Sequence, residues 1–205
     1  MSTEFLLYEG FEELDAFGPF EVLAVGGFAP MLVTLSPADR VTGAHGAVVM
    51  AHAALSERPD LLVLPGGGWA ARREHGAWGE AQRGTLPRAI RACHDAGTTV
   101  AGVCTGGMLL AKAGLLTGRP AVTHRCALED LAAAGAEVIA DARVVDDDDV
   151  ITCGGVTAGI DLALRLLERR HGGAAAERAA EQIEYRPHGP VHMGPAACGT
   201  ERDGG

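Results

Sequence analysis

The chain has 205 residues, of which 47% are hydrophobic and 21% charged, and its formal net charge is −10. This length suits one compact domain with a large core, and no apolar run reaches the roughly 20 residues that a membrane-spanning helix needs. A negative surface repels phosphate backbones and anionic lipids, which argues against a nucleic-acid or membrane partner. We therefore expect a globular protein that acts on a small molecule.

Cysteine usage indicates a reducing compartment. The five cysteines form no C-x-x-C pair, and the N-terminus turns acidic after a short apolar run, unlike a secretory signal. An odd number of cysteines without such a signal is typical of free thiols in the cytoplasm. The sequence thus predicts a cytoplasmic location, no disulfide scaffold and no metal site.

Short apolar runs alternate with helical stretches from the N-terminus onward. Strands are expected at residues 5–8, 31–35, 61–64 and 99–103, and helices at 17–25, 80–96, 106–116 and 127–134. Runs that are apolar throughout indicate strands buried on both faces. The alternation predicts right-handed βαβ units in a three-layer α/β sandwich with a mainly parallel central sheet.

The C-terminal third has a different pattern. Two β-prone runs, 138–145 and 150–152, flank the four aspartates 146–149 and predict a hairpin with a solvated turn, since calcium-loop spacing is lacking. Closing helices are expected at 157–170 and 174–185. The Pro/Gly-rich residues 188–205 predict a poorly ordered tail or an arm lying on a neighbouring chain, so the domain is assigned to residues 1–187.

The sharpest local motif is Gly102-Val103-Cys104-Thr105-Gly106, between a buried strand and a helix. It has the spacing of a nucleophile elbow with cysteine in place of serine. The flanking glycines would permit a strained turn, and the helix N-terminus would lower the pKa of the thiol. The alternative is a small buried hydrophobe before a helix.

A second motif is Pro65-Gly66-Gly67-Gly68, at the end of another buried strand. Exposed amides there, together with that of Thr105, could form an oxyanion hole. A flexible turn is the alternative.

Three further side chains at strand ends could belong to a site. Asp15 is a candidate acid or base if it shares the sheet edge with Cys104, or else a helix N-cap. His124 follows a strand, where it could be structural or bind substrate. Cys126 and Cys153 lack an elbow and are expected to be small hydrophobes.

These segments together resemble the ThiJ/PfpI superfamily, within the flavodoxin-like class I glutamine-amidotransferase-like fold. The resemblance runs from about residue 4 to Pro187. It rests on Leu64-Pro65-Gly66-Gly67, the Cys104 elbow and the segment from Val156 to Asp161.

Within that superfamily, the chain looks most like the isonitrile (isocyanide) hydratase branch. The resemblance implies Cys104 as nucleophile, Thr105 as its elbow neighbour, Asp15 as acidic partner, and Gly66 and Gly67 as amide donors. The branch segments are Asp15-x-x-Gly18-Pro19-x-Glu21, Val103-Cys104-Thr105-Gly106, Ala113-Gly114-Leu115-Leu116-x-Gly118-Arg119, Thr123-His124 and Glu184-Tyr185-x-Pro187.

The resemblance implies a homodimeric enzyme that hydrates an isonitrile to an N-substituted formamide with neither metal nor organic cofactor. Alternatives are a glyoxalase-like lyase, an amide hydrolase, or a non-catalytic redox sensor based on Cys104. Protease-like members carry histidine where Thr105 stands, and members acting on 2-oxoaldehydes usually carry glutamate at the Asp15 position. Both departures favour the hydratase. Regulator members add a helix-turn-helix domain, for which the 18 residues after Pro187 leave no room.

Overall fold

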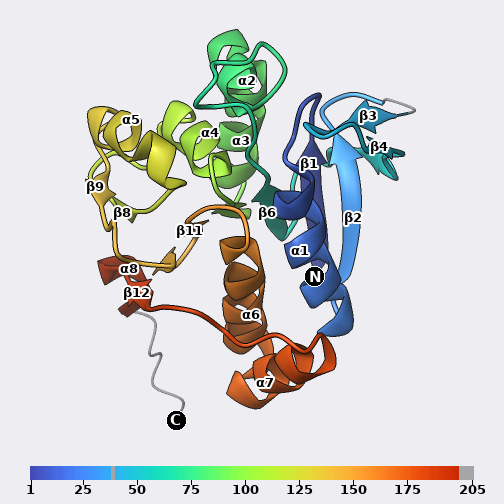
Figure 1. Ribbon diagram of the computed structural model, residues 1–205, viewed down its shortest axis with the longest axis vertical. Coiled ribbons are helices and arrows are strands. Elements are labelled where there is room, and N and C mark those ends of the chain that lie inside the picture. The colour runs from blue at the N-terminus through green and yellow to red at the C-terminus, as the bar shows by residue number, and fades with distance from the viewer. Residues whose placement is uncertain (38–39, 199–205) are drawn as a thin grey trace.

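The protein is built around one eight-stranded sheet (Figure 1). The computed structural model describes residues 1–37 and 40–198. The strands lie in the order β12-β10-β11-β7-β6-β1-β2-β5, and every neighbouring pair is parallel except β10 with β11. The sheet strands are β1 (Ser2–Leu7), β2 (Ala29–Thr34), β5 (Ala53–Ala54), β6 (Leu61–Leu64), β7 (Thr99–Gly102), β10 (Val144–Asp147), β11 (Val150–Cys153) and β12 (Val191–Met193).

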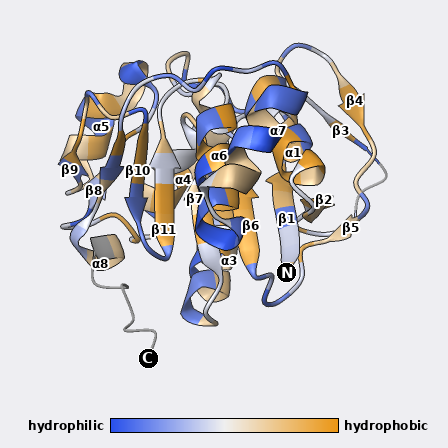
Figure 2. Ribbon diagram, turned by 90° about the horizontal axis from the view of Figure 1, so that it is seen from below, coloured by the Kyte–Doolittle hydropathy of each residue, from blue (hydrophilic) through white to orange (hydrophobic). Residues whose placement is uncertain are grey.

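Helices cover both faces of this sheet and bury its apolar strands (Figure 2). Helices α1, α6 and α7 pack together on one face, and α2, α3 and α4 pack together on the other. This arrangement confirms the predicted three-layer α/β sandwich. The helices are α1 (Glu13–Val25), α2 (Ala77–Arg83), α3 (Thr85–Asp95), α4 (Gly106–Lys112), α5 (Leu128–Ala133), α6 (Ala158–His171), α7 (Gly173–Gln182) and α8 (Pro195–Cys198).

Two predicted elements are divided in the structure. The helix expected over 80–96 is two helices, because Gly84 has φ +72 and closes α2 in the left-handed region. The run 138–145 also splits, since β9 (Glu137–Val138) pairs with β8 (Pro120–Ala121) in a separate small sheet. A second small sheet joins β3 (Val41–Thr42) to β4 (Val48–Val49), two short strands that the sequence pattern did not predict.

The prediction of a poorly ordered tail over residues 188–205 is in part wrong. Residues Val191–Met193 form β12, which pairs with β10 in parallel, and the Gly194 amide donates to the Asp146 carbonyl at 2.7 Å. The domain therefore extends past Pro187 through α8. Residues 199–205 of the predicted tail lie outside the described residues.

The predicted hairpin at the four aspartates is confirmed. Its aspartates were expected to be exposed to solvent, but the side chains of Asp146 and Asp147 are buried. The Asp146 side chain is fully buried and lies 2.8 Å from Arg165 Nε and 2.9 Å from Arg169 Nη1. The Asp147 carboxylate lies 2.6 Å from Arg119 Nε. Arginines on α6 and in the loop before β8 thus neutralise a buried acidic turn, a pairing that local spacing cannot reveal.

Replacing Asp146 by asparagine is expected to lower the free energy of unfolding by about 3 kcal/mol, because both arginines lose their buried counter-charge. Urea denaturation measures the change. Asp148, whose side chain is 39% exposed, provides the control, and Asp148→Asn should cost no more than about 1 kcal/mol. Equal effects of the two substitutions would contradict the buried-pair interpretation.

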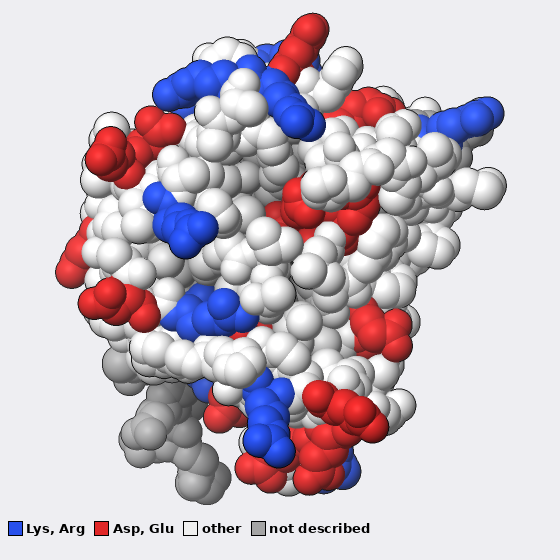
Figure 3. Space-filling view, viewed as in Figure 1, with Lys and Arg blue, Asp and Glu red and all other residues white. Residues whose placement is uncertain are grey.

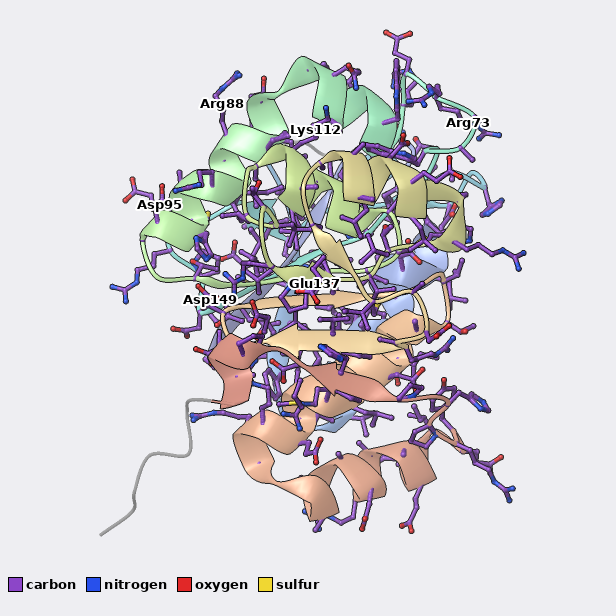
Figure 4. The ribbon with its side chains drawn as sticks, turned by 90° about the vertical axis from the view of Figure 1, so that its left-hand side faces the viewer. Arg73, Arg88, Asp95, Lys112, Glu137 and Asp149 are labelled. Carbon is purple, nitrogen blue, oxygen red and sulfur yellow. The ribbon has the colours of Figure 1, made fainter. Side chains whose placement is uncertain are left out.

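Charged side chains of both signs are interspersed on the face shown in Figure 3. The hairpin network lies away from the loop after β6, since Asp149 and Arg73 stand at opposite sides of the molecule in Figure 4. None of the described helices is long and apolar enough to cross a membrane.

Candidate active site

Cys104 occupies the sharp turn between β7 and α4. Its φ of +55 lies in the left-handed region, which a non-glycine residue adopts at a cost of about 1–2 kcal/mol. A Cβ on Gly106 would collide with the Leu64 carbonyl oxygen, and one on Gly102 would lie 2.7 Å from the Gly107 nitrogen. The two glycines of the motif therefore allow the strand and helix to approach closely enough for the predicted elbow.

Asp15 lies beside Cys104, brought there by the first turn of α1. Its side chain is fully buried, and its Oδ2 accepts a 2.9 Å hydrogen bond from the Gly66 amide. Its Oδ1 is buried and has no hydrogen-bond partner among the described residues. Because α1 begins at Glu13 with Glu12 as its N-cap, the alternative that Asp15 caps the helix is wrong.

The surroundings of the Asp15 carboxyl and the Cys104 thiol favour the protonated form of both groups. Burial raises the pKa of Asp15 well above its ordinary value, against the opposing effect of the Gly66 amide. Burial, and then the Asp15 charge, also raise the pKa of the Cys104 thiol, which the Thr105 amide only partly offsets. The expectation of a lowered Cys104 pKa is therefore wrong, because desolvation outweighs the helix N-terminus. We infer that the pair carries at most one negative charge at neutral pH.

The glycine loop after β6 is well ordered by hydrogen bonds. The Gly66 amide donates to Asp15, and the Gly67 amide donates to Thr105 Oγ1 at 2.9 Å. The Gly66 and Gly67 amides, which were expected to bind an oxyanion, thus donate their hydrogen bonds to protein side chains. They hold Asp15 and Thr105 in place, so the loop positions the site rather than presenting these two donors.

Two further residues support the site, although the sequence did not make either a candidate site residue. The Tyr8 hydroxyl contacts the Pro65 and Gly66 carbonyl oxygens at 2.5 and 3.0 Å. The Thr123 hydroxyl donates to the Cys104 carbonyl oxygen at 2.7 Å. Both lie at strand ends near the elbow. Thr123 belongs to the Thr123-His124 segment of the resemblance, whereas no motif marks Tyr8, whose partners are distant in sequence.

A cavity of about 260 Å³ opens onto Cys104 and Thr105. His124 lines it, and its Nδ1 accepts a 3.2 Å hydrogen bond from the Cys126 amide. His124 is therefore both structural and at the site, and burial lowers its pKa. The other lining residues are Glu12, Ala44, His45, Gly67, Gly68, Trp69, Ala70, Ala71, Arg73, Cys126 and Val156.

The other cysteines divide between core and cavity. Cys153 is fully buried, as expected of a small hydrophobe, and burial raises the pKa of its thiol. Cys126 is exposed and faces the same cavity as Cys104, so its expected role as a small buried hydrophobe is wrong.

Among the described residues, one group could offer three metal-ligand atoms together: Glu12, Glu13 and His45. These side chains already bond to one another and to the backbone. Glu13 Oε1 accepts from the amides of His45 and Ala47, and His45 Nε2 lies 3.2 Å from Glu12 Oε1. The group forms a hydrogen-bonded cluster at the cavity, in which Glu13 Oε2 is buried and has no partner among the described residues.

Comparison with known proteins agrees with this geometry. The isonitrile hydratase of Pseudomonas putida is 34% identical over 192 residues, which are 93% of this chain and 81% of that protein. A deglycase of Thermococcus kodakarensis is 28% identical over 166 residues, covering 74% of this chain and 89% of the relative.

A solved structure of a ThiJ/PfpI family protein from Pseudomonas syringae superposes with a TM-score of 0.79 and 28% identity, covering 92% of this chain and 76% of that one. The model of the DJ-1/PfpI family matches residues 1–169. With its cysteine at a strained elbow, its buried carboxyl partner and this match over most of its length, the chain belongs to the DJ-1/PfpI family.

Proposed function

We propose that the protein is an isonitrile hydratase that uses Cys104 as nucleophile and Asp15 as proton donor, and yields an N-substituted formamide. The observation that carries the proposal is the buried Asp15 Oδ1, which has no partner among the described residues and lies next to a thiol that opens onto a small cavity. A carboxyl group held in this way keeps a proton that it can deliver to a bound substrate.

The first half of the reaction is an addition to the terminal isonitrile carbon. The Cys104 sulfur bonds to that carbon, and a proton from the thiol–carboxyl pair passes through Asp15 to the same carbon. The product is a thioimidate, R–N=CH–S–Cys104. No free thiolate has to accumulate, so the raised pKa of the thiol is compatible with the reaction.

In the second half, water adds to the thioimidate carbon, and the nitrogen gains a proton. Collapse of the tetrahedral intermediate breaks the C–S bond, releases R–NH–CHO and returns a proton to the sulfur. The His124 Nδ1 is an acceptor, so the neutral ring carries its proton on Nε2 and can donate toward the substrate. The Thr105 amide hydrogen-bonds to the sulfur and is a backbone donor at the site.

Several observations support this activity over the alternatives. A relative named isonitrile hydratase is similar over 93% of the chain, and Thr105 stands where a peptidase-like relative would carry histidine. We further propose a homodimer, because the cavity is open at a surface that a second copy could complete. We also propose a cytoplasmic location, which the free cysteines favour.

The test is a product assay with an alkyl isonitrile and, separately, with methylglyoxal. We expect formamide from the isonitrile at a rate proportional to enzyme concentration. Lactate from methylglyoxal without formamide would replace the hydratase by a glyoxalase-like lyase. Failure to form either product, together with selective modification of Cys104 by peroxide, would favour the redox sensor.

A further inference from the structure

We propose that His45, oriented by Glu12, is the general base that activates water for the second half of the reaction. The inference deepens the proposed function and rests on it. Cys104 and Asp15 form the thioimidate, but neither activates the water that hydrolyses it. It also gives a role to a residue that the sequence motifs did not single out.

The turn that carries His45 is anchored to the start of α1. The Ala44 amide donates to the Phe11 carbonyl oxygen at 2.8 Å, and the His45 amide donates to Glu13 Oε1, also at 2.8 Å. The Ala47 amide reaches the same oxygen at 3.3 Å. Asp15 lies in the first turn of α1, so the turn with His45 and the Asp15 carboxyl are both held in place by the start of the same helix.

The ring orientation follows from the Glu12 contact. His45 Nε2 lies 3.2 Å from Glu12 Oε1, so the neutral ring places its proton on Nε2. Its Nδ1 then carries a free lone pair, and among the described residues no group bonds to that atom. Both side chains line the cavity that contains Cys104. His45 is 74% exposed, so water reaches it from solvent.

Two other candidate bases near Cys104, His124 in the cavity and Asp15 behind it, are less suited to this step. The Nδ1 lone pair of His124 is occupied by the Cys126 amide, which leaves that ring a donor. Asp15 is fully buried, away from solvent, and its proton is used in the first addition. His45 is thus a lining residue that combines a lone pair without a partner among the described residues with ready access to water, and Glu12 orients its ring.

The proton balance is closed. His45 Nδ1 takes one proton from the attacking water as its oxygen bonds to the thioimidate carbon, and a second water molecule gives one to the substrate nitrogen. The neutral His124 ring keeps its Nε2 proton and acts there as a hydrogen-bond donor only. When the C–S bond breaks, the hydroxyl proton leaves and the sulfur regains one. The His45 proton then passes through solvent to the hydroxide left by the second water, and water and thioimidate have become formamide and thiol.

The experiment follows the two half-reactions separately. Native protein and the variants His45→Gln and Glu12→Gln are mixed with an alkyl isonitrile, quenched, and analysed by intact-protein mass spectrometry for the adduct on Cys104. His45→Gln should form the adduct within about twofold of the native rate but break it down about a hundredfold more slowly. Glu12→Gln should slow breakdown about tenfold. His188→Gln, at a histidine outside the cavity, is the matched control and should leave both rates unchanged.

Imidazole added to His45→Ala should accelerate adduct breakdown, which a merely structural role would not produce. Native breakdown rates in His45→Gln, or equal losses in formation and breakdown, would overturn the inference. Loss of native turnover on treatment with a chelator would also overturn it in favour of a metal at Glu12, Glu13 and His45. If native protein forms no adduct at all, the proposed function itself fails, which is distinct from an adduct that the variants hydrolyse normally.

Discussion

Replacing Cys104 by serine is expected to lower isonitrile turnover by at least about 10⁴-fold, because the hydroxyl is a much weaker nucleophile than the thiol in the same buried turn. Cys104→Ala should be equally inactive. Neither variant should form a covalent adduct with an alkyl isonitrile. Turnover is measured as formamide released, and the adduct by the mass of the intact protein.

The matched control is Cys126→Ser, since this exposed thiol lines the same cavity. It should keep native kinetics within about twofold. The proposed mechanism is refuted if Cys104→Ala still forms the adduct and Cys126→Ser does not. That result would identify Cys126 as the nucleophile. Thermal unfolding of each variant shows whether the elbow still folds.

Replacing Asp15 by asparagine is expected to lower turnover about 10³-fold, because the amide cannot deliver a proton to the isonitrile carbon. The side-chain carbonyl of the introduced asparagine can still accept from the Gly66 amide, so the loop should remain in place. Pre-steady-state mixing should show slow adduct formation. Glu21→Gln, on the exposed face of the same helix, serves as the control, and native adduct formation in Asp15→Asn would exclude the acid role.

The Asp15→Asn substitution should also change how the free energy of unfolding depends on pH. Burial raises the pKa of Asp15, so the native protein binds its proton more tightly than the unfolded chain does. That stabilisation is complete below the unfolded value of about 4 and is lost as pH rises toward the raised native value. Relative to Asp15→Asn, the native protein should therefore lose stability as pH rises in urea denaturation. A parallel pH dependence of the two proteins would contradict a buried, protonated Asp15.

Local sequence determined the architecture and the elbow at Cys104. Alternating apolar runs and helical stretches require a parallel sheet between helices, because strands buried on both faces need cover on each. The glycines at 102 and 106 reveal the elbow at Cys104, since close packing of strand and helix excludes a Cβ there. Both features depend on near neighbours in the chain, which spacing records directly.

Tertiary structure alone decided what surrounds the sulfur. The Gly66–Asp15 and Gly67–Thr105 bonds join residues 51 and 38 positions apart, and they turned expected oxyanion donors into positioning groups. Burial, which no motif encodes, reversed the expected pKa shift of Cys104. The buried Asp146 pairs and the placement of His45 over the cavity likewise depend on which distant segments meet. The physical reason is that desolvation and hydrogen bonding act across space, whereas sequence patterns describe neighbours along the chain.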